Sequence, residues 1–270
     1  MAAFGSLGCE MVAADIETPD GAGKAVEGVE TVIMTVGLPY TEFNRYPPMM
    51  KIVIDACRKA GVRRFLLVTN VYMYAAPQAG LVTETAPLNP PAFKGKMRLE
   101  QQRAVEQSGM QWIVLHLPDF YGPDAELSYA DMIVKAAIQK KAADLFSPSD
   151  TPHQFVYTPD IAPIVADLLA REDGWNQRYN FAGSGMISVK DFARKVYETA
   201  GTPFRSRNAP RWMIRLLGIF QPLMREFVEM QYLQSTPVNL DDSKLVRHLG
   251  TVKRTSYDDG IRSMVAAYSR

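Results

Sequence analysis

The segment Arg64-Phe-Leu-Leu-Val-Thr69-Asn70-Val-Tyr72-Met-Tyr74-Ala75 joins an apolar run to a short polar and aromatic ending. Such a run is typical of a parallel strand that helices bury on both faces. Similar runs predict strands at Glu10–Ala14, Thr31–Val36 and Trp112–Leu117, and amphipathic stretches separate them. This alternation predicts an α/β sheet whose parallel strands are connected by helices.

Two stretches flanking these strands have helical patterns. Met49–Ala60 mixes Ile, Ala and Cys with charged residues, and Gly61 follows it as a helix stop. Lys96–Ser108 is rich in Gln, Arg and Glu, so we expect much of its surface to face water.

The second half has shorter elements. The patterns predict helices at Ala130–Lys141 and Pro159–Arg171, a strand at Tyr179–Phe181, and a helix that Ser188 caps. Pro210–Leu233 is rich in Trp, Met, Leu and Phe. We interpret it as core packing, with a substrate lid, a dimer surface or a membrane-surface helix as alternatives.

The composition argues against several function classes. The chain of 270 residues has 30 Lys plus Arg against 29 Asp plus Glu, so no strong field attracts nucleic acid. Two cysteines and three histidines are too few for a disulfide framework or a Cys/His zinc site, and no metal is predicted. No apolar run approaches the roughly 18 residues of a membrane span. We expect a cytoplasmic protein whose partner is a small-molecule substrate.

A glycine-rich phosphate-binding turn is not found. Gly5-Ser-Leu-Gly8 offers two glycines, but Met11 takes the position of the third. Gly21-Ala-Gly23-Lys24 is similar to part of a P-loop, yet Thr18 and Ala25 replace its first glycine and its Ser/Thr. We interpret both as plain turns.

Several motifs follow one another in an order that is informative in itself. They are Asp15-Ile16 with Gly28-Val29, the ending Thr69–Ala75, Thr83-Glu84 with Pro87, His116-Leu-Pro-Asp119-Phe-Tyr121-Gly122-Pro123, Phe155-Val-Tyr-Thr-Pro-Asp160-Ile-Ala162 and Tyr179-Asn180-Phe-Ala-Gly183. This series resembles the extended short-chain dehydrogenases/reductases, the NAD-dependent epimerase/dehydratase family. The resemblance implies a Rossmann-like nucleotide-binding domain over residues 1–123. A mainly substrate-binding α/β domain would cover 124–270, with some segments returning to the sheet.

The same resemblance implies NAD or NADP as the cofactor. Asp15 would close a third strand and contact the adenine, although an Asp there can also simply cap the next turn. The family's first strand, glycine turn, first helix and second strand would then precede residue 1. We expect either a truncated gene model or a protein without that pyrophosphate site. The cofactor candidates are Asp15, Ile16, Val36, Gly37, Leu38, Thr69, Lys96, Leu117 and Pro118.

The catalytic pair of the family is incomplete. Its members use Tyr-x-x-x-Lys for proton chemistry, and alignment on Glu100 puts Lys96 at the lysine and Ala92 at the tyrosine. Asn70 stands at the family's Ser/Thr. We consider Tyr72 or His153 as the replacement proton donor, while Lys96 as a solvated helix charge and His153 as a surface-loop residue are the alternatives.

The remaining candidates concern the substrate. They are Tyr40, Tyr74, Asp119, Tyr121 and Gln154. The resemblance implies an NAD(P)-dependent oxidoreductase or epimerase-like protein, with a degenerate Tyr-x-x-x-Lys site, that acts on a small carbonyl or hydroxyl metabolite. A cofactor-independent isomerase or lyase and a non-enzymatic ligand-sensing protein are alternatives, and we also consider a homodimer.

Overall fold

A four-stranded parallel sheet forms the centre of the computed structural model, which describes residues 8–75, 80–126, 128–146, 148–209 and 228–269. Its order is β1-β2-β3-β7, and every neighbouring pair is parallel. The strands are β1 (Thr31–Met34), β2 (Arg64–Thr69), β3 (Gln111–His116) and β7 (Gln177–Asn180). The predicted α/β class and the strands at 31–36, 64–69 and 112–117 are confirmed.

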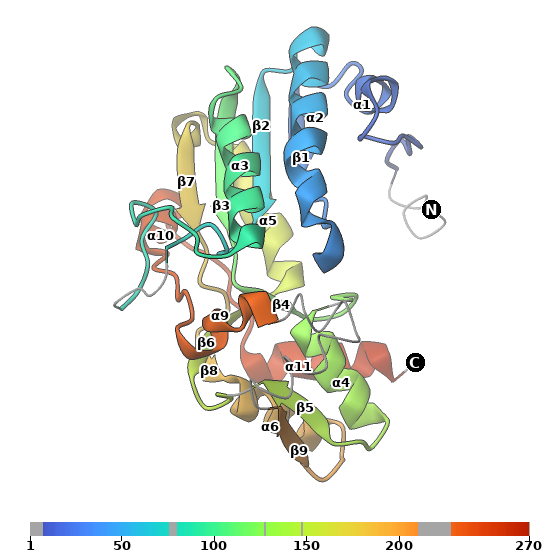
Figure 1. Ribbon diagram of the computed structural model, residues 1–270, viewed down its shortest axis with the longest axis vertical. Coiled ribbons are helices and arrows are strands. Elements are labelled where there is room, and N and C mark those ends of the chain that lie inside the picture. Colours follow the sequence, from blue (N-terminus) through green and yellow to red (C-terminus); the bar gives the residue numbers. More distant parts are fainter. Residues whose placement is uncertain (1–7, 76–79, 127, 147, 210–227, 270) are drawn as a thin grey trace.

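Helices cover both faces of this sheet (Figure 1). Phe65 and Leu67 of β2 pack in the cluster with α2 and α3, whereas Leu66 packs in the opposite cluster with α5. This double burial explains the uninterrupted apolar run. The helices around the sheet are α1 (Pro19–Ala25), α2 (Tyr46–Ala60), α3 (Phe93–Glu106), α5 (Ile161–Leu169) and α10 (Ser243–Leu249).

A second region with its own core lies beyond the carboxyl ends of these strands (Figure 1). In one small sheet β6 pairs with β4 and β8, and in another β5 pairs with β9. Its elements are β4 (Asp119–Tyr121), α4 (Tyr129–Ile138), β5 (Ala143–Phe146), β6 (Pro152–Tyr157), β8 (Met186–Ser188), α6 (Val189–Thr199), β9 (Ser206–Ala209) and α11 (Tyr257–Tyr268). Short connecting elements are η2 (Tyr40–Arg45), η3 (Thr158–Asp160), η4 (Glu172–Gly174) and α9 (Tyr232–Ser235). Between β6 and β8 the chain returns to the main sheet as β7.

The predicted strand at Glu10–Ala14 is wrong. These residues form no regular element, and Met11 and Val12 are exposed. The four apolar residues of the segment meet no neighbouring strand, because within the described ranges β1 pairs with β2 alone. The segment leads instead into α1, whose first turn Thr18 caps by accepting a hydrogen bond from the Gly21 N–H.

The expectation that much of the polar helix faces water holds for one face, with Lys96, Glu100 and Arg103 exposed, and fails for the other. α3 begins at Phe93, and Lys94, Arg98, Gln101 and Gln102 on its inner face are buried. Arg98 donates to the Thr69 hydroxyl at 2.7 Å, and Gln102 lies 2.9 Å from the His116 ring. These bonds to the sheet make burial of polar side chains tolerable, which a hydrophobicity pattern does not reveal.

Within the described residues, no helix is long and apolar enough to cross a membrane. That part of the chain also brings together no group of three metal-binding side chains. Cys9 is exposed and Cys57 is buried. Most of the Pro210–Leu233 segment lies outside the described residues, so its interpretation stays a prediction.

Candidate active site

The segments that follow β1, β2 and β3 converge at one edge of the main sheet. They contain Gly37, Asn70 and Pro118 respectively. Ligands of parallel α/β sheets bind at this edge, where the strand direction exposes loop backbone and helix ends. A Cβ atom added at Gly37 would meet no atom within 4 Å, so open space lies over this backbone.

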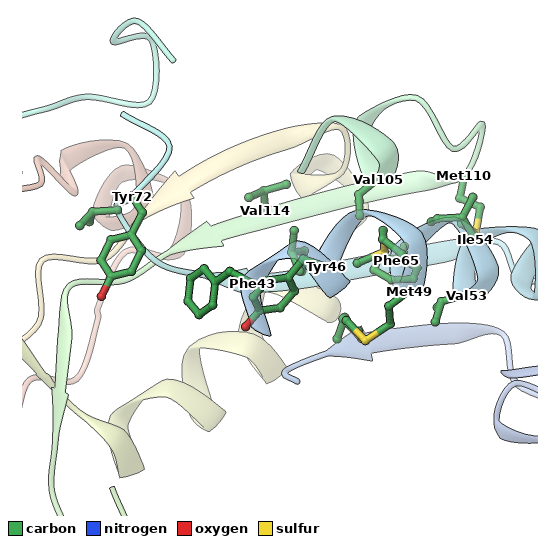
Figure 2. Packing of buried hydrophobic residues seen from close by; sticks show 14 of the residues in the cluster. Phe43, Tyr46, Met49, Val53, Ile54, Phe65, Tyr72, Val105, Met110 and Val114 are labelled. Carbon is green, nitrogen blue, oxygen red and sulfur yellow. The ribbon is translucent and has the colours of Figure 1, made fainter. Parts of the chain in front are cut away.

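Two phenols from different loops meet at this edge. Tyr40 lies in η2 after β1, Tyr72 follows β2, and their hydroxyl groups form a hydrogen bond. Their rings meet edge-on, with centroids 6.5 Å apart. Figure 2 shows Tyr72 at the end of the core beyond Phe43 and Tyr46, with its hydroxyl pointing away from them. The sequence named both tyrosines, and the structure brings them together.

The surroundings keep both phenols protonated. Burial raises the pKa of Tyr40 to about 12 and raises the pKa of Tyr72 well above its ordinary value. The nearby Asp119 charge raises both pKa values further. Desolvation in turn raises the pKa of Asp119 to about 6, so this carboxyl changes charge near neutral pH. The edge therefore combines a phenol pair with a carboxyl group that can exchange a proton.

A buried ion pair lies behind the phenols. Lys94 is 1% exposed, and its Nζ is 2.6 Å from Glu229 Oε2. The backbone N–H of Lys94 also donates to Glu229 Oε1 at 2.9 Å, which replaces the missing side-chain cap at the start of α3. The ammonium lies 5.8 Å from the Tyr40 ring centroid and 6.0 Å from that of Phe43. The ammonium is thus within cation–π distance of the Tyr40 ring.

Lys96 does not share this location. It is exposed and lies two residues from both Lys94 and Arg98, which face inward. Two residues correspond to about 200° around a helix, so Lys96 projects from the opposite side. The alternative of a solvated helix charge describes this side chain. The sequence reasoning missed Lys94 because it used the distance to Glu100, although Lys94, Arg98 and Val105 mark the inner face.

Three of the substrate candidates have their polar atoms occupied inside the protein. The Tyr74 hydroxyl donates to Asn180 Oδ1 at 2.8 Å, and the Tyr121 hydroxyl lies 2.8 Å from that of Ser184. The Gln154 amide donates to the carbonyl oxygen of Leu240 and accepts from its N–H, at 3.0 and 2.6 Å. All three are buried. They hold segments together rather than face the sheet edge.

Asn70 and Asp15 both hold turns in the structure. Asn70 Oδ1 accepts the Tyr72 N–H at 3.0 Å, which fixes the backbone that carries the phenol. Asp15 Oδ1 accepts the Glu17 N–H at 3.0 Å, and its carbonyl accepts the Thr18 N–H at 3.1 Å. Ile16 packs against the α2 core. An adenine contact at Asp15 and Ile16 stays a prediction.

His153 lies in β6 rather than in a surface loop, and it is 5% exposed. Desolvation lowers its pKa to about 4. The ring is therefore neutral at neutral pH and is a poor proton donor there, contrary to the catalytic role that we considered.

The comparisons with known proteins agree with this arrangement. A family model described as NAD(P)H-binding matches residues 1–140. The chain belongs to this NAD(P)H-binding family. No curated protein matches it. Three predictions from the sequence motifs are thereby confirmed: the family, the Rossmann-like fold, and NAD or NADP as the cofactor class.

Solved structures similar to this NAD(P)H-binding protein are nucleotide-sugar enzymes. A UDP-glucuronic acid 4-epimerase from Bacillus cereus in complex with UDP-glucuronic acid and NAD is 15% identical, with a TM-score of 0.79 over 99% of this chain and 85% of that one. The dTDP-glucose 4,6-dehydratase DesIV from Streptomyces venezuelae is 17% identical, with a TM-score of 0.78 over 96% of this chain and 79% of that one. A UDP-glucose 4-epimerase from Thermotoga maritima is 16% identical, with a TM-score of 0.75 over 94% of this chain and 82% of that one. At these identities the likeness shows a shared fold.

The described residues fit one half of the cofactor. Open space lies over the Gly37 backbone, at the edge of the sheet that also carries Tyr72 and Pro118. The glycine turn that holds a pyrophosphate in such folds has no counterpart after a strand in the described ranges. We therefore assign residues to the nicotinamide side alone.

Proposed function

We propose that this protein is an NAD(P)-dependent oxidoreductase or epimerase-like enzyme that acts on a small carbonyl or hydroxyl metabolite. The observation that carries the proposal is the hydrogen bond between Tyr40 and Tyr72 at the carboxyl edge of the sheet. A protonated phenol at this edge can do the work of the tyrosine that Ala92 replaces.

When bound, the nicotinamide supplies or accepts a hydride at the substrate carbon. Tyr72 then donates its phenolic proton to the substrate oxygen as negative charge develops there. The Tyr40 hydroxyl donates to the resulting phenolate, and the Lys94 ammonium behind Tyr40 stabilises the same charge. Gly37 and Pro118 would border the ring.

The raised pKa values favour one direction. The pKa of Tyr40 is about 12 and that of Tyr72 lies well above its ordinary value, so both phenols stay protonated at neutral pH and can give up a proton but not accept one. Carbonyl reduction should therefore be faster than alcohol oxidation below pH 8. Asp119 opposes formation of the phenolate while it is charged, so its protonation near pH 6 should assist the donor.

One observation favours a second function. Asp119 has a pKa of about 6, and its charge acts on Tyr40 and Tyr72. A carboxylate base beside a phenol acid could shift a proton between two carbons of a substrate without a cofactor. This would be the isomerase or lyase alternative.

A titration distinguishes the two functions. Purified protein is titrated with NADH and with NADPH, and binding is followed by nucleotide fluorescence and thermal shift. We expect saturable binding of at least one nucleotide, followed by its oxidation when a carbonyl substrate is added. Binding of neither nucleotide would contradict the oxidoreductase and leave the Asp119 reaction. The cytoplasmic location and the homodimer stay predictions.

A further inference from the structure

A buried ring nitrogen without a hydrogen-bond partner in the described ranges lies in β6, near the same edge of the sheet. The backbone of Gln234 acts on the His153 ring as a hydrogen-bond acceptor does, because it raises the histidine pKa against the larger lowering by desolvation. Nε2 is buried and has no hydrogen-bond partner within the described part of the chain. Nδ1 therefore carries the proton, and Nε2 is an acceptor that lacks a donor.

The sheet register places this acceptor beside Asp119. β4 and β6 are parallel, and Asp119 pairs with Phe155. Side chains alternate along a strand, so His153, Phe155 and Asp119 share one face of the small sheet. His153 is two residues from Phe155 along β6, so it lies diagonally across from Asp119. A molecule held between Asp119 and the phenols can thus reach His153.

Tyr232 closes the same region from α9. Its charge interacts with Tyr72, and its hydroxyl is buried without a hydrogen-bond partner in the described ranges. The backbone of Gln234, two residues further along α9, acts on the His153 ring. In Figure 1, α9 is drawn near β6 and below α3, in agreement with the effect of Gln234 on His153. Two polar groups with unused hydrogen-bonding capacity therefore lie near α9, one on the side of the phenols and one on the side of β6.

The charges of this region disfavour an anionic occupant. Asp119 is negative above pH 6, and its charge acts on both phenols. The unused acceptor on His153 calls for a donor, which a hydroxyl group provides and a carboxylate or phosphate does not.

We propose that His153 Nε2 and the Tyr232 hydroxyl bind a second hydroxyl group of the substrate, which is thereby a neutral carbonyl compound with at least one hydroxyl besides the reacting oxygen. A preference in kcat/KM for such substrates rests on the proposed reductase function. Binding of the hydroxyl group at His153 and Tyr232 does not depend on that function.

Three four-carbon probes test the specificity in the full chain: erythrulose, which is a neutral hydroxyketone, butane-2,3-dione, which is neutral without hydroxyls, and 2-oxobutanoate, which is an anion. The readout is kcat/KM with NADH or NADPH. For His153→Phe we expect the ratio of erythrulose to butane-2,3-dione to fall about tenfold, the value of one buried neutral hydrogen bond. His153→Gln, which keeps an acceptor, should preserve most of the ratio, and 2-oxobutanoate should be the poorest substrate. His248→Gln is the histidine control outside the cleft.

Nitrogen-15 NMR of labelled histidines gives a readout that does not depend on turnover. We expect an unprotonated Nε2 on His153 at pH 7, and a shift of its resonance when erythrulose is added but not when butane-2,3-dione is added. If no probe is reduced but this shift occurs, the site stands and the reductase function fails. A proton on Nε2, an unchanged kinetic ratio in His153→Phe, or equal responses to both neutral probes would overturn the proposal. The last result would indicate that water alone occupies the acceptor.

Discussion

The hydroxyl of Tyr40 bonds to the hydroxyl of Tyr72, although 32 positions separate the two residues in the chain. They meet because β1 and β2 are adjacent and parallel, so the loops at their carboxyl ends leave the sheet side by side. Phe43 packs against both rings, with centroids 5.4 Å from Tyr40 and 6.4 Å from Tyr72. The phenol pair is thus held by the fold, and changes in its supports should affect the site.

Gly95 tests how closely α3 must approach the Tyr72 backbone. A Cβ atom at Gly95 would collide with the carbonyl oxygen of Tyr72 and with Pro90. Gly95→Ala should therefore lower the free energy of unfolding by roughly 1–3 kcal/mol, measured by urea denaturation. Gly23→Ala in α1, where a Cβ meets nothing within 4 Å, should instead be neutral or stabilising by about 0.5–1 kcal/mol. Equal effects would contradict the close approach at Gly95.

Glu229 should be important for stability, because it compensates a buried ammonium. Glu229→Gln leaves Lys94 charged inside the protein, and we expect a loss of about 3 kcal/mol in urea unfolding. Glu30→Gln removes the partner of Arg63 in an exposed pair and should cost at most about 0.5 kcal/mol. A loss at Glu229 as small as that at Glu30 would show that Lys94 is solvated.

The pH dependence of stability has a defined sign. In the folded protein the pKa of His116 is lowered to about 3 and that of His153 to about 4. Below pH 6.5 the unfolded chain therefore binds more protons than the folded protein, and the free energy of unfolding decreases as the pH is lowered. Asp119 acts in the opposite direction between pH 3.8 and 6, because its pKa is raised. Near pH 5 the three groups leave a slope of about 1.4 kcal/mol per pH unit.

Two variants separate these contributions in urea unfolding between pH 4.5 and 6. Asp119→Asn should increase the slope to about 2.7 kcal/mol per pH unit, since both histidines then act without opposition. His153→Gln should reduce it to nearly zero. If neither variant changes the slope, the buried histidines and Asp119 do not have these pKa values.

The two lysines at the start of α3 should differ in activity. The double variant Lys94→Met/Glu229→Gln removes both charges of the buried pair. No uncompensated charge is left inside the protein, so it should lose less stability than either single variant. We expect a roughly 3- to 30-fold lower kcat with erythrulose, because the cation behind Tyr40 is lost. Lys96→Ala should stay within twofold of the parent. A larger loss at Lys96 than in the double variant would restore the original assignment.

The sequence predicted what hydrophobic patterning and motif order control. The run Arg64–Thr69 and the ending with Tyr72 identified the sheet and one partner of the phenol pair, because a doubly buried strand must be apolar. Lys94 was missed, since polar residues on the inner face of α3 depend on partners such as Glu229, 135 positions away. The burial of His153 likewise depends on contacts that no local pattern encodes.

The turnover of Tyr72→Phe tests the central claim most directly. The variant keeps the ring in its packing and removes the proton, so kcat for erythrulose reduction with the bound nucleotide should fall about 10²- to 10⁴-fold. Tyr40→Phe, which loses the supporting hydrogen bond alone, should lose roughly tenfold. A Tyr72→Phe enzyme that reduces erythrulose at the parent rate would contradict the account, because the proton would then come from another group.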